Sequence, residues 1–159
     1  MKIKIIICFL LLYSCGENNI DLEIEKSNKY RIEKEFAKAI TILKGIEKKY
    51  AKSNDLEKVN FLLGEIYLND IKDYNYAIEE FKKVSIDPNL YAKSTFMIGY
   101  IYSNNLNEYS MAIEYYKKFI DNFQGHDLYP SVEYELEQLS QFEKVIDSLN
   151  VIANTKLGD

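Results

Sequence analysis

One pattern of residues occurs twice in the chain, starting at Gly64 and again 35 residues later at Gly99. The first copy is GEIYLNDIKDYNYAIEEFKKV and the second is GYIYSNNLNEYSMAIEYYKKF. Similarity at a fixed offset indicates stacked structural repeats, because each repeat buries its apolar face against its neighbours rather than alone. The chain is therefore restricted to a repeat architecture over at least this region.

Each copy is predicted to form two helices joined by a turn. Apolar residues recur at helical spacing on both sides of Asn69-Asp70 in the first copy and of Asn104-Asn105 in the second. Asparagine and aspartate favour turns. The chain has only two prolines and six glycines, a composition that favours helices over a β-sandwich or barrel. The fold is therefore predicted to be all-α.

Small residues at matching positions are predicted to let the paired helices approach closely. Gly64 on the first helix and Ala77 on the second carry almost no side chain, and aromatic residues fill the space on either side. Asp87-Pro88 is predicted to end the second helix, because the residue before proline disfavours the α region. The structural positions are Gly64, Tyr67, Ala77 and Phe81 in the first copy, and Gly99, Tyr102, Ala112 and Tyr116 in the second.

This arrangement of small and aromatic residues resembles the tetratricopeptide repeat (TPR). The resemblance implies a right-handed α-solenoid of antiparallel helix pairs with a concave groove. Residues 55–89 and 90–124 would be full repeats, one residue longer than the family's usual length of about 34, with the extra residue in the turn. Residues 30–54 and 128–157 would be partial repeats, which gives about two full and two partial repeats in the helical domain of residues 29–159.

The two partial repeats are predicted from weaker matches. Residues 30–50 are expected to form only the second helix of the first repeat, since EFAKAITILKGI aligns with DYNYAIEEFKKV. Downstream, a helix would start at Pro130 and a separate helix would pair with it. The apolar residues assigned to that partner helix are Val145, Ile146, Leu149 and Ile152.

The upstream helix has an alternative interpretation as a site of oligomerisation. Its apolar residues recur with alternating spacings of four and three, which is also the spacing of a coiled-coil seam. The seam residues would be Ile32, Phe36, Ala39, Leu43, Ile46 and Tyr50.

The N-terminal stretch MKIKIIICFLLLYSC has the charged-then-apolar order of a secretory signal. Its apolar run is too short to span a bilayer as a helix. It ends in Leu12-Tyr13-Ser14-Cys15, which resembles the lipobox of bacterial lipoproteins. The resemblance implies a signal peptide over residues 1–14, and diacylglycerol and further acylation, such as palmitate, on Cys15. Residues 15–28 would then be a lipidated tether with an early helix.

Groups that support catalysis or metal binding are scarce. Cys8 would leave with the signal and Cys15 would carry lipid, so no free thiol would remain for a disulfide, a nucleophile or a metal. His126 is the only histidine and lies in a predicted loop, and no phosphate-binding glycine loop is present. A net charge of −5 gives no electrostatic reason to bind nucleic acid. We therefore expect a chain that is not an enzyme and needs no cofactor or metal.

The TPR resemblance also places residues of the first helix of each repeat in the concave groove. Three of them, Phe61, Phe96 and Tyr100, would form an aromatic strip suited to binding protein. An alternative is that the N-terminal helix folds across this strip and buries it. The predicted groove residues are Lys58, Phe61, Glu65 and Asn69, then Lys93, Phe96, Tyr100 and Asn104, with Glu135 and Gln138 from the last partial repeat.

A lipobox followed by TPR units is similar to short repeat lipoproteins of bacterial envelopes, above all the BamD-like lipoprotein of outer-membrane β-barrel assembly. The similarity covers residues 30–140 and includes YKKFIDNF at residues 116–123. It implies a protein-binding scaffold, monomeric within a complex, anchored in the outer membrane and facing the periplasm. Its partners would be envelope proteins such as a β-barrel insertase. The alternatives are a pilus- or division-associated TPR lipoprotein and a surface-exposed lipoprotein that binds a ligand.

Overall fold

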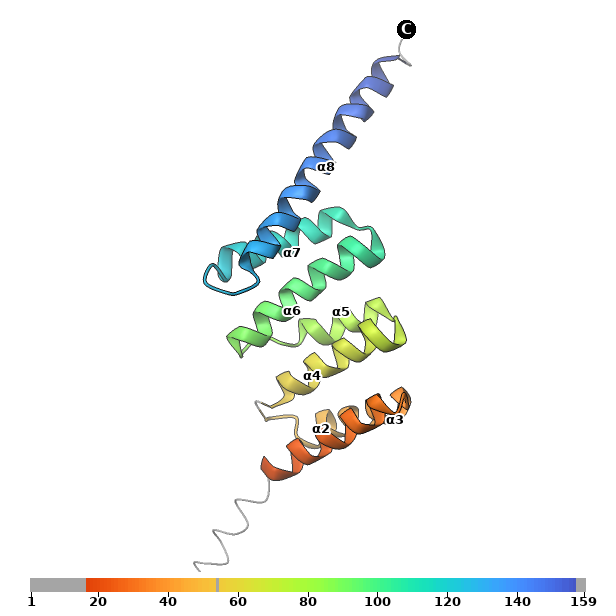
Figure 1. Ribbon diagram of the computed structural model, residues 1–159, viewed down its shortest axis with the longest axis vertical. Helices are drawn as coiled ribbons and strands as arrows, with labels where there is room; N and C mark the ends of the chain where they lie inside the picture. Colours follow the sequence, from red (N-terminus) through yellow and green to blue (C-terminus); the bar gives the residue numbers. More distant parts are fainter. Residues whose placement is uncertain (1–16, 54, 157–159) are drawn as a thin grey trace, which may run out of the picture. The chain divides into compact units, whose positions relative to one another are not determined.

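The computed structural model of the chain describes residues 17–53 and 55–156. The predicted signal peptide, its cleavage site and Cys15 lie outside these residues. The described residues form α-helices and two π-helical turns joined by short loops, and no strand occurs among them (Figure 1). The prediction of an all-α fold is confirmed. Within each of the two units described below, helices pack in adjacent pairs, consistent with a TPR-like solenoid.

The chain divides into two compact units, one ending at Ile86 and the other beginning at Asp87. Unit 1 contains α2 (Glu17–Ile32), α3 (Phe36–Lys49), α4 (Leu56–Glu65), the π-helical turn η1 (Ile66–Ile71) and α5 (Tyr74–Lys82). Unit 2 contains α6 (Pro88–Ile101), the π-helical turn η2 (Tyr102–Leu106), α7 (Tyr109–Asn122) and α8 (Tyr129–Lys156). The two copies of the sequence pattern therefore lie in different units.

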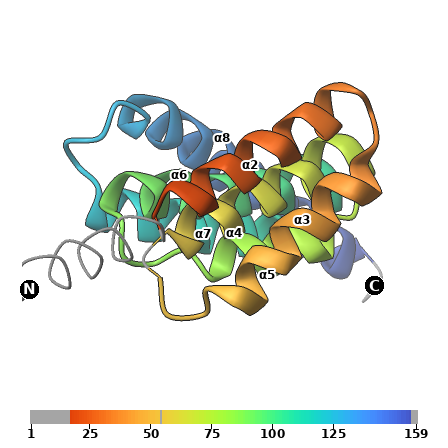
Figure 2. The ribbon, with the colours of Figure 1, turned by 90° about the horizontal axis from the view of Figure 1, so that it is seen from below.

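The apolar core of unit 1 includes residues of α2, α3 and α4. Ile20 of α2, Leu43 of α3 and Leu63 of α4 are buried in one cluster. Burial of an aliphatic side chain of this size contributes about 1.5–3 kcal/mol to the stability of the folded state. Helices α2 and α3 lie side by side (Figure 2). The upstream residues therefore supply both helices of a pair, where the sequence predicted only the second.

Helix α2 replaces most of the tether predicted over residues 15–28, since the chain is helical from Glu17. Its buried face has few apolar residues: Ile20 is buried, Ile24 is half-buried, and Ser27 takes the next position at helical spacing. The Ser27 hydroxyl donates a hydrogen bond to the carbonyl oxygen of Ala39, 3.1 Å away. Because Ser27 is polar, the apolar spacing that predicts a buried helix face is incomplete in this part of the sequence.

The coiled-coil alternative for residues 32–50 is wrong. Ala39, Leu43 and Ile46 are fully buried within unit 1, whereas Ile32 is 82% exposed at the end of α2. Lys34, with a φ of 61°, interrupts the helix between Ile32 and α3. A coiled-coil seam requires its apolar residues on one free face of a continuous helix, and these residues lie on two helices that pack together.

The extra residue of each full repeat lies in the π-helical turn that ends its first helix. In unit 1 the amide of Asp73 donates to the carbonyl oxygen of Tyr67, six residues earlier, and an equivalent bond closes η2. The turn after α2 closes over five residues, from Glu35 to Tyr30. A π-helical turn is wider than an α-helical one and holds one more residue. Asn69-Asp70, predicted to be the turn, lies inside η1.

Asp87 and Pro88 begin α6 rather than end α5. The Asp87 carboxylate accepts hydrogen bonds from the amides of Asn89 and Leu90, at 3.0 and 2.8 Å, and so caps the helix. Pro88 follows in the first turn, where a missing amide proton costs nothing. Helix α5 ends earlier, at Lys82. The sequence signal at this dipeptide is therefore a helix start.

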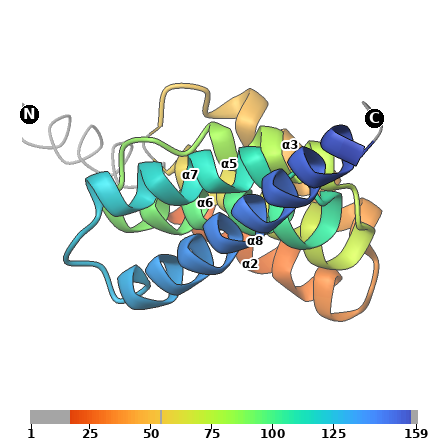
Figure 3. The same cartoon turned by 90° about the horizontal axis from the view of Figure 1, so that it is seen from above.

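Helix α8 is one continuous helix of 28 residues, where two helices were predicted. Its first half packs on α7 through Val132 and Leu139, which are buried. Its second half projects away from α7 (Figures 1 and 3). After Pro130, in the first turn, α8 contains no further proline and no glycine, so nothing in its sequence breaks the helix. The predicted partner helix is wrong, because its residues extend α8.

Candidate functional site

The first and second helices of each repeat meet where a glycine faces an aromatic ring. A Cβ atom added to Gly64 would lie 2.6 Å from Cε1 of Phe81, and one added to Gly99 would lie 2.6 Å from Cε1 of Tyr116. Both rings are fully buried. The sequence predicted a close approach near Ala77, and the structure shows that the ring one turn after it occupies the space. These contacts position the outer residues of α4 and α6.

Two of the predicted groove aromatics pack onto these buried rings. Phe61 is half-buried and lies edge-on to Phe81, with ring centroids 5.4 Å apart. Phe96, also half-buried, stacks on Tyr116 at 6.2 Å. Each of these rings therefore shares its surface between the core and the outside of the helix pair.

In unit 2, Phe96 and Tyr100 form a small aromatic surface, which we call the α6 face. Their ring centroids are 6.3 Å apart, and Tyr100 is 41% exposed. Glu135 of α8 lies near enough for its charge to act on the Tyr116 hydroxyl beneath this surface. An accessible tyrosine beside a half-exposed phenylalanine and a carboxylate can bind another protein by stacking and hydrogen bonding.

The polar groove residues are mostly exposed. Asn69, Lys93 and Gln138 face solvent, and Glu135 is half-buried. The remaining three make short-range contacts. The ammonium of Lys58 lies 3.5 Å from Asp55, a carboxylate oxygen of Glu65 lies 3.8 Å from Arg31, and the Asn104 amide donates to the carbonyl oxygen of Tyr100 at 3.3 Å.

The contacts of α2 bear on the alternative that the N-terminal helix buries the aromatic strip. The buried cluster that α2 joins through Ile20 contains Val59, Leu63 and Ile66 of unit 1, whereas Phe61 packs against Phe81. Helix α2 is also tied to the end of the first helix of the repeat, since Arg31 donates to Asp70 at 2.6 Å. Phe61 therefore takes part in neither of these contacts of α2.

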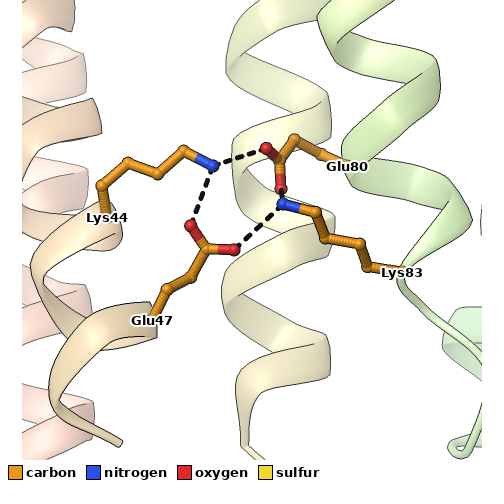
Figure 4. A network of polar contacts seen from close by, with 4 residues as sticks. All are labelled: Lys44, Glu47, Glu80 and Lys83. Atoms are coloured by element: carbon orange, nitrogen blue, oxygen red, sulfur yellow. Dashed lines mark hydrogen bonds and ion pairs between the residues drawn. The ribbon is translucent and has the colours of Figure 1, made fainter. Parts of the chain in front are cut away.

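Sequence reasoning missed a four-residue network of charges between α3 and α5 (Figure 4). Glu80, only 2% exposed, accepts hydrogen bonds from Lys44 at 2.5 Å and from Lys83 at 2.7 Å. Glu47 completes the network, with its two oxygens 2.8 Å from Lys44 and 3.1 Å from Lys83. Each helix carries a Lys–Glu pair at a spacing of three, but nothing in the sequence indicates that the two pairs, 36 residues apart, meet.

The network shifts the pKa values of two of its members, Lys44 and Glu47, toward their charged forms. Partial burial by itself would lower the pKa of Lys44, but hydrogen bonds to Glu47 and Glu80 outweigh it and raise that pKa. For Glu47, burial would raise the pKa of the carboxyl, and hydrogen bonds from Lys44 and Lys83 lower it instead. Ion pairs from Lys44 to Glu80 and from Lys83 to Glu47 therefore join α3 to α5.

The Tyr116 hydroxyl is buried in unit 2, and none of the described residues forms a hydrogen bond with it. Burial, with the negative charge of Glu135 nearby, raises the pKa of this phenol above its ordinary value. The matching residue of unit 1 is Phe81, which has no hydroxyl. A buried polar group without a partner costs about 1–3 kcal/mol.

Tyr116→Phe is therefore expected to stabilise unit 2 by about 1 kcal/mol, since it removes a desolvated hydroxyl and keeps the ring against Gly99. The measurement is chemical denaturation followed by circular dichroism. Tyr115→Phe is the matched control, because the neighbouring Tyr115 is only half-buried, and it should change stability by less than about 0.5 kcal/mol. A loss of stability in Tyr116→Phe would mean that the hydroxyl has a bound partner.

None of the groups of histidine, cysteine, aspartate or glutamate within residues 17–53 and 55–156 is arranged to hold a metal ion. In the same part of the chain, no helix combines the length and the apolarity that crossing a membrane requires.

Comparison with known families identifies one repeat. Residues 94–126 match the tetratricopeptide repeat family. The matched segment lies entirely in unit 2 and runs from α6 through η2 and α7 to His126. It contains Gly99, Tyr116 and the α6 face. No curated protein sequence matches the chain.

Proposed function

We propose, from the tetratricopeptide repeat at residues 94–126, that this chain is a protein-binding scaffold without enzymatic activity. The match to that repeat carries the proposal, because repeats of this kind generally mediate interactions between proteins. The α6 face supplies the contact surface. It combines Tyr100, which is accessible, with Phe96, which stacks on the buried ring of Tyr116. At protein interfaces a few residues contribute most of the binding energy, and tyrosine is enriched among them.

The experiment is photo-crosslinking in cells that produce the full chain. A photoreactive phenylalanine replaces Tyr100 on the α6 face or, as the matched control, Tyr76 on α5, which is 52% exposed. We expect one discrete adduct with another protein at position 100 and none at position 76. Tyr100→Ala should abolish capture from position 93, where Lys93 is exposed about two helical turns earlier on α6. Equal adducts at positions 100 and 76 would argue against a binding face on α6.

We further propose that the scaffold is lipid-anchored through Cys15 in a bacterial cell envelope. The order of a basic, apolar N-terminus and a lipobox-like Leu12-Tyr13-Ser14-Cys15 supports this proposal. Two acyl chains on one cysteine are sufficient for stable attachment, whereas one is marginal.

Cys15→Ser is expected to transfer the protein from the detergent-rich to the aqueous phase of a Triton X-114 extraction without changing its circular dichroism spectrum. The reason is that serine cannot form the thioether that carries the lipid. Incorporation of labelled palmitate should be lost in the same variant, and Ser14→Thr is a control that keeps the thiol. Retention of Cys15→Ser in the detergent phase would show that the anchor is not a lipid on this cysteine.

Among envelope complexes, we propose the β-barrel assembly machinery of the outer membrane as the partner. Support comes from the order of lipobox and repeats in the sequence and from YKKFIDNF at residues 116–123. The adduct formed at position 100 tests this directly. A β-barrel insertase in the adduct would support the proposal, and a secretin or a peptidoglycan-associated protein would favour a pilus or division role instead. Cleavage by protease added to whole cells would favour a surface-exposed lipoprotein.

A further inference from the structure

Helix α8 has an apolar stripe that the rest of unit 2 does not cover. Helix α7 has 14 residues and α8 has 28, so α8 runs past the start of α7 after crossing it (Figure 3). The stripe, which we call the α8 overhang, has residues at spacings of three, one and three, all on one helical face. Its members and their exposed fractions are Phe142 45%, Val145 55%, Ile146 40% and Leu149 55%.

A pocket of about 810 Å³ lies between the α8 overhang and the start of α7. Its apolar wall is formed by Tyr109, Met111, Phe142 and Ile146. Phe142 contacts the edge of Tyr109, with ring centroids 5.2 Å apart. Two aromatic rings that contact one another therefore form part of the pocket lining.

The polar lining of this pocket is negative. Glu108, Glu143 and Asp147 line it, and no lysine or arginine is among the described residues that do. Glu143 is oriented by the Ser110 hydroxyl, which donates to it at 3.1 Å. The amides at the start of α7 carry a partial positive charge of roughly one half, which three carboxylates outweigh. An occupant with positive charge beside its apolar residues is the one that this lining favours.

The packing inside each unit indicates that the occupant is a helix. In unit 1, α2 and α3 share a buried cluster with α4, and in unit 2 α8 packs on α7, which pairs with α6. The pocket between the start of α7 and the α8 overhang offers the same kind of packing to a further helix, and no other described helix of unit 2 lines it. Its apolar residues are spaced to meet the ridge of one more helix.

We propose that the pocket between α7 and the α8 overhang binds an amphipathic α-helix of another protein, with an apolar stripe flanked by lysine or arginine. The apolar stripe of that helix packs on Phe142, Ile146 and Leu149. Its basic residues pair with Glu143 and Asp147. A second copy of this chain is disfavoured as the occupant, because its own overhang would bring the same carboxylates into the pocket. The site is separate from the α6 face.

The test measures binding of two labelled synthetic helices to the purified full chain by fluorescence anisotropy. Both helices have leucine at spacings of three and four. One carries lysines beside the stripe and the other carries glutamates. We expect the lysine helix to bind at least about tenfold more tightly than the glutamate helix. Ile146→Ser and the double change Glu143→Lys with Asp147→Lys should each weaken its binding by at least about tenfold.

Matched controls separate this site from general attraction to an acidic chain. Tyr134→Ser removes another exposed apolar side chain of α8, and Glu133→Lys with Glu137→Lys makes the same change in charge outside the pocket. Binding should stay within about twofold in both controls and in Tyr100→Ala. Equal losses in pocket and control variants would overturn the proposal, as would binding of neither helix. Self-association in sedimentation that Ile146→Ser abolishes would also overturn it, in favour of a second copy.

Discussion

Gly64→Leu and Gly99→Leu are each expected to unfold the unit that carries the substitution. The Cβ of the new side chain would lie 2.6 Å from the ring of Phe81 or of Tyr116, and both rings are fully buried. A ring packed on all sides can move only if the two helices separate. Overpacking a core by added methylenes costs about 1–3 kcal/mol. Leucine adds several carbons at an already short distance, and the loss approaches the roughly 5 kcal/mol stability of a small domain.

Gly45→Leu is the matched control for this prediction. Gly45 also lies within a helix, α3, but nothing stands within 4 Å of a Cβ built on it. Leucine there should raise stability by about 0.5–1 kcal/mol, because it favours helix more than glycine does. Thermal unfolding followed by circular dichroism compares the three variants. Melting of Gly64→Leu and Gly99→Leu at or above the temperature of the parent chain would show that the glycines do not limit the approach of the helices.

The same glycines explain why the helix pairs could be predicted from the sequence. Gly64 and Phe81 are 17 residues apart, and Gly99 and Tyr116 are too. Both residues of such a contact lie within one repeat, so the same pairing of glycine and aromatic residue recurs in both copies and can be recognised in the sequence. The residues of the α6 face, Phe96 among them, were predicted from their place in the repeat. Periodicity gives the helix face but not the ring orientation, so the packing of Phe61 on Phe81 was not foreseen.

The features that sequence reasoning missed depend on contacts between elements that do not share the repeat. Helix α2 buries Ser27 where an apolar residue would have signalled a helix. Helix α8 continues through Phe142 because no residue breaks it, and a pattern of apolar residues does not show whether a helix folds back or runs on. Lys44 and Glu80 meet across 36 residues, and opposite charges at the surface of two amphipathic helices are too common to indicate a pair.

Glu80→Ala is expected to lower the free energy of unfolding of unit 1 by about 2–3 kcal/mol. The carboxylate is 2% exposed and accepts one hydrogen bond from Lys44 and one from Lys83. Removal of one member of a fully buried ion pair costs about 3–5 kcal/mol. The cost here is smaller, because the side chains of both lysines are about two-fifths exposed, can regain water, and keep Glu47 as a partner.

Glu79→Ala provides the control, since Glu79 is exposed and its removal changes the net charge by the same amount. Chemical denaturation should show a change of less than about 0.5 kcal/mol for this variant. The double change Lys44→Ala with Glu80→Ala should cost less than the sum of the two single changes, because the second change removes a cation that has already lost a partner. Strict additivity, or equal stability of Glu80→Ala and Glu79→Ala, would mean that the charges lie near one another without joining α3 to α5.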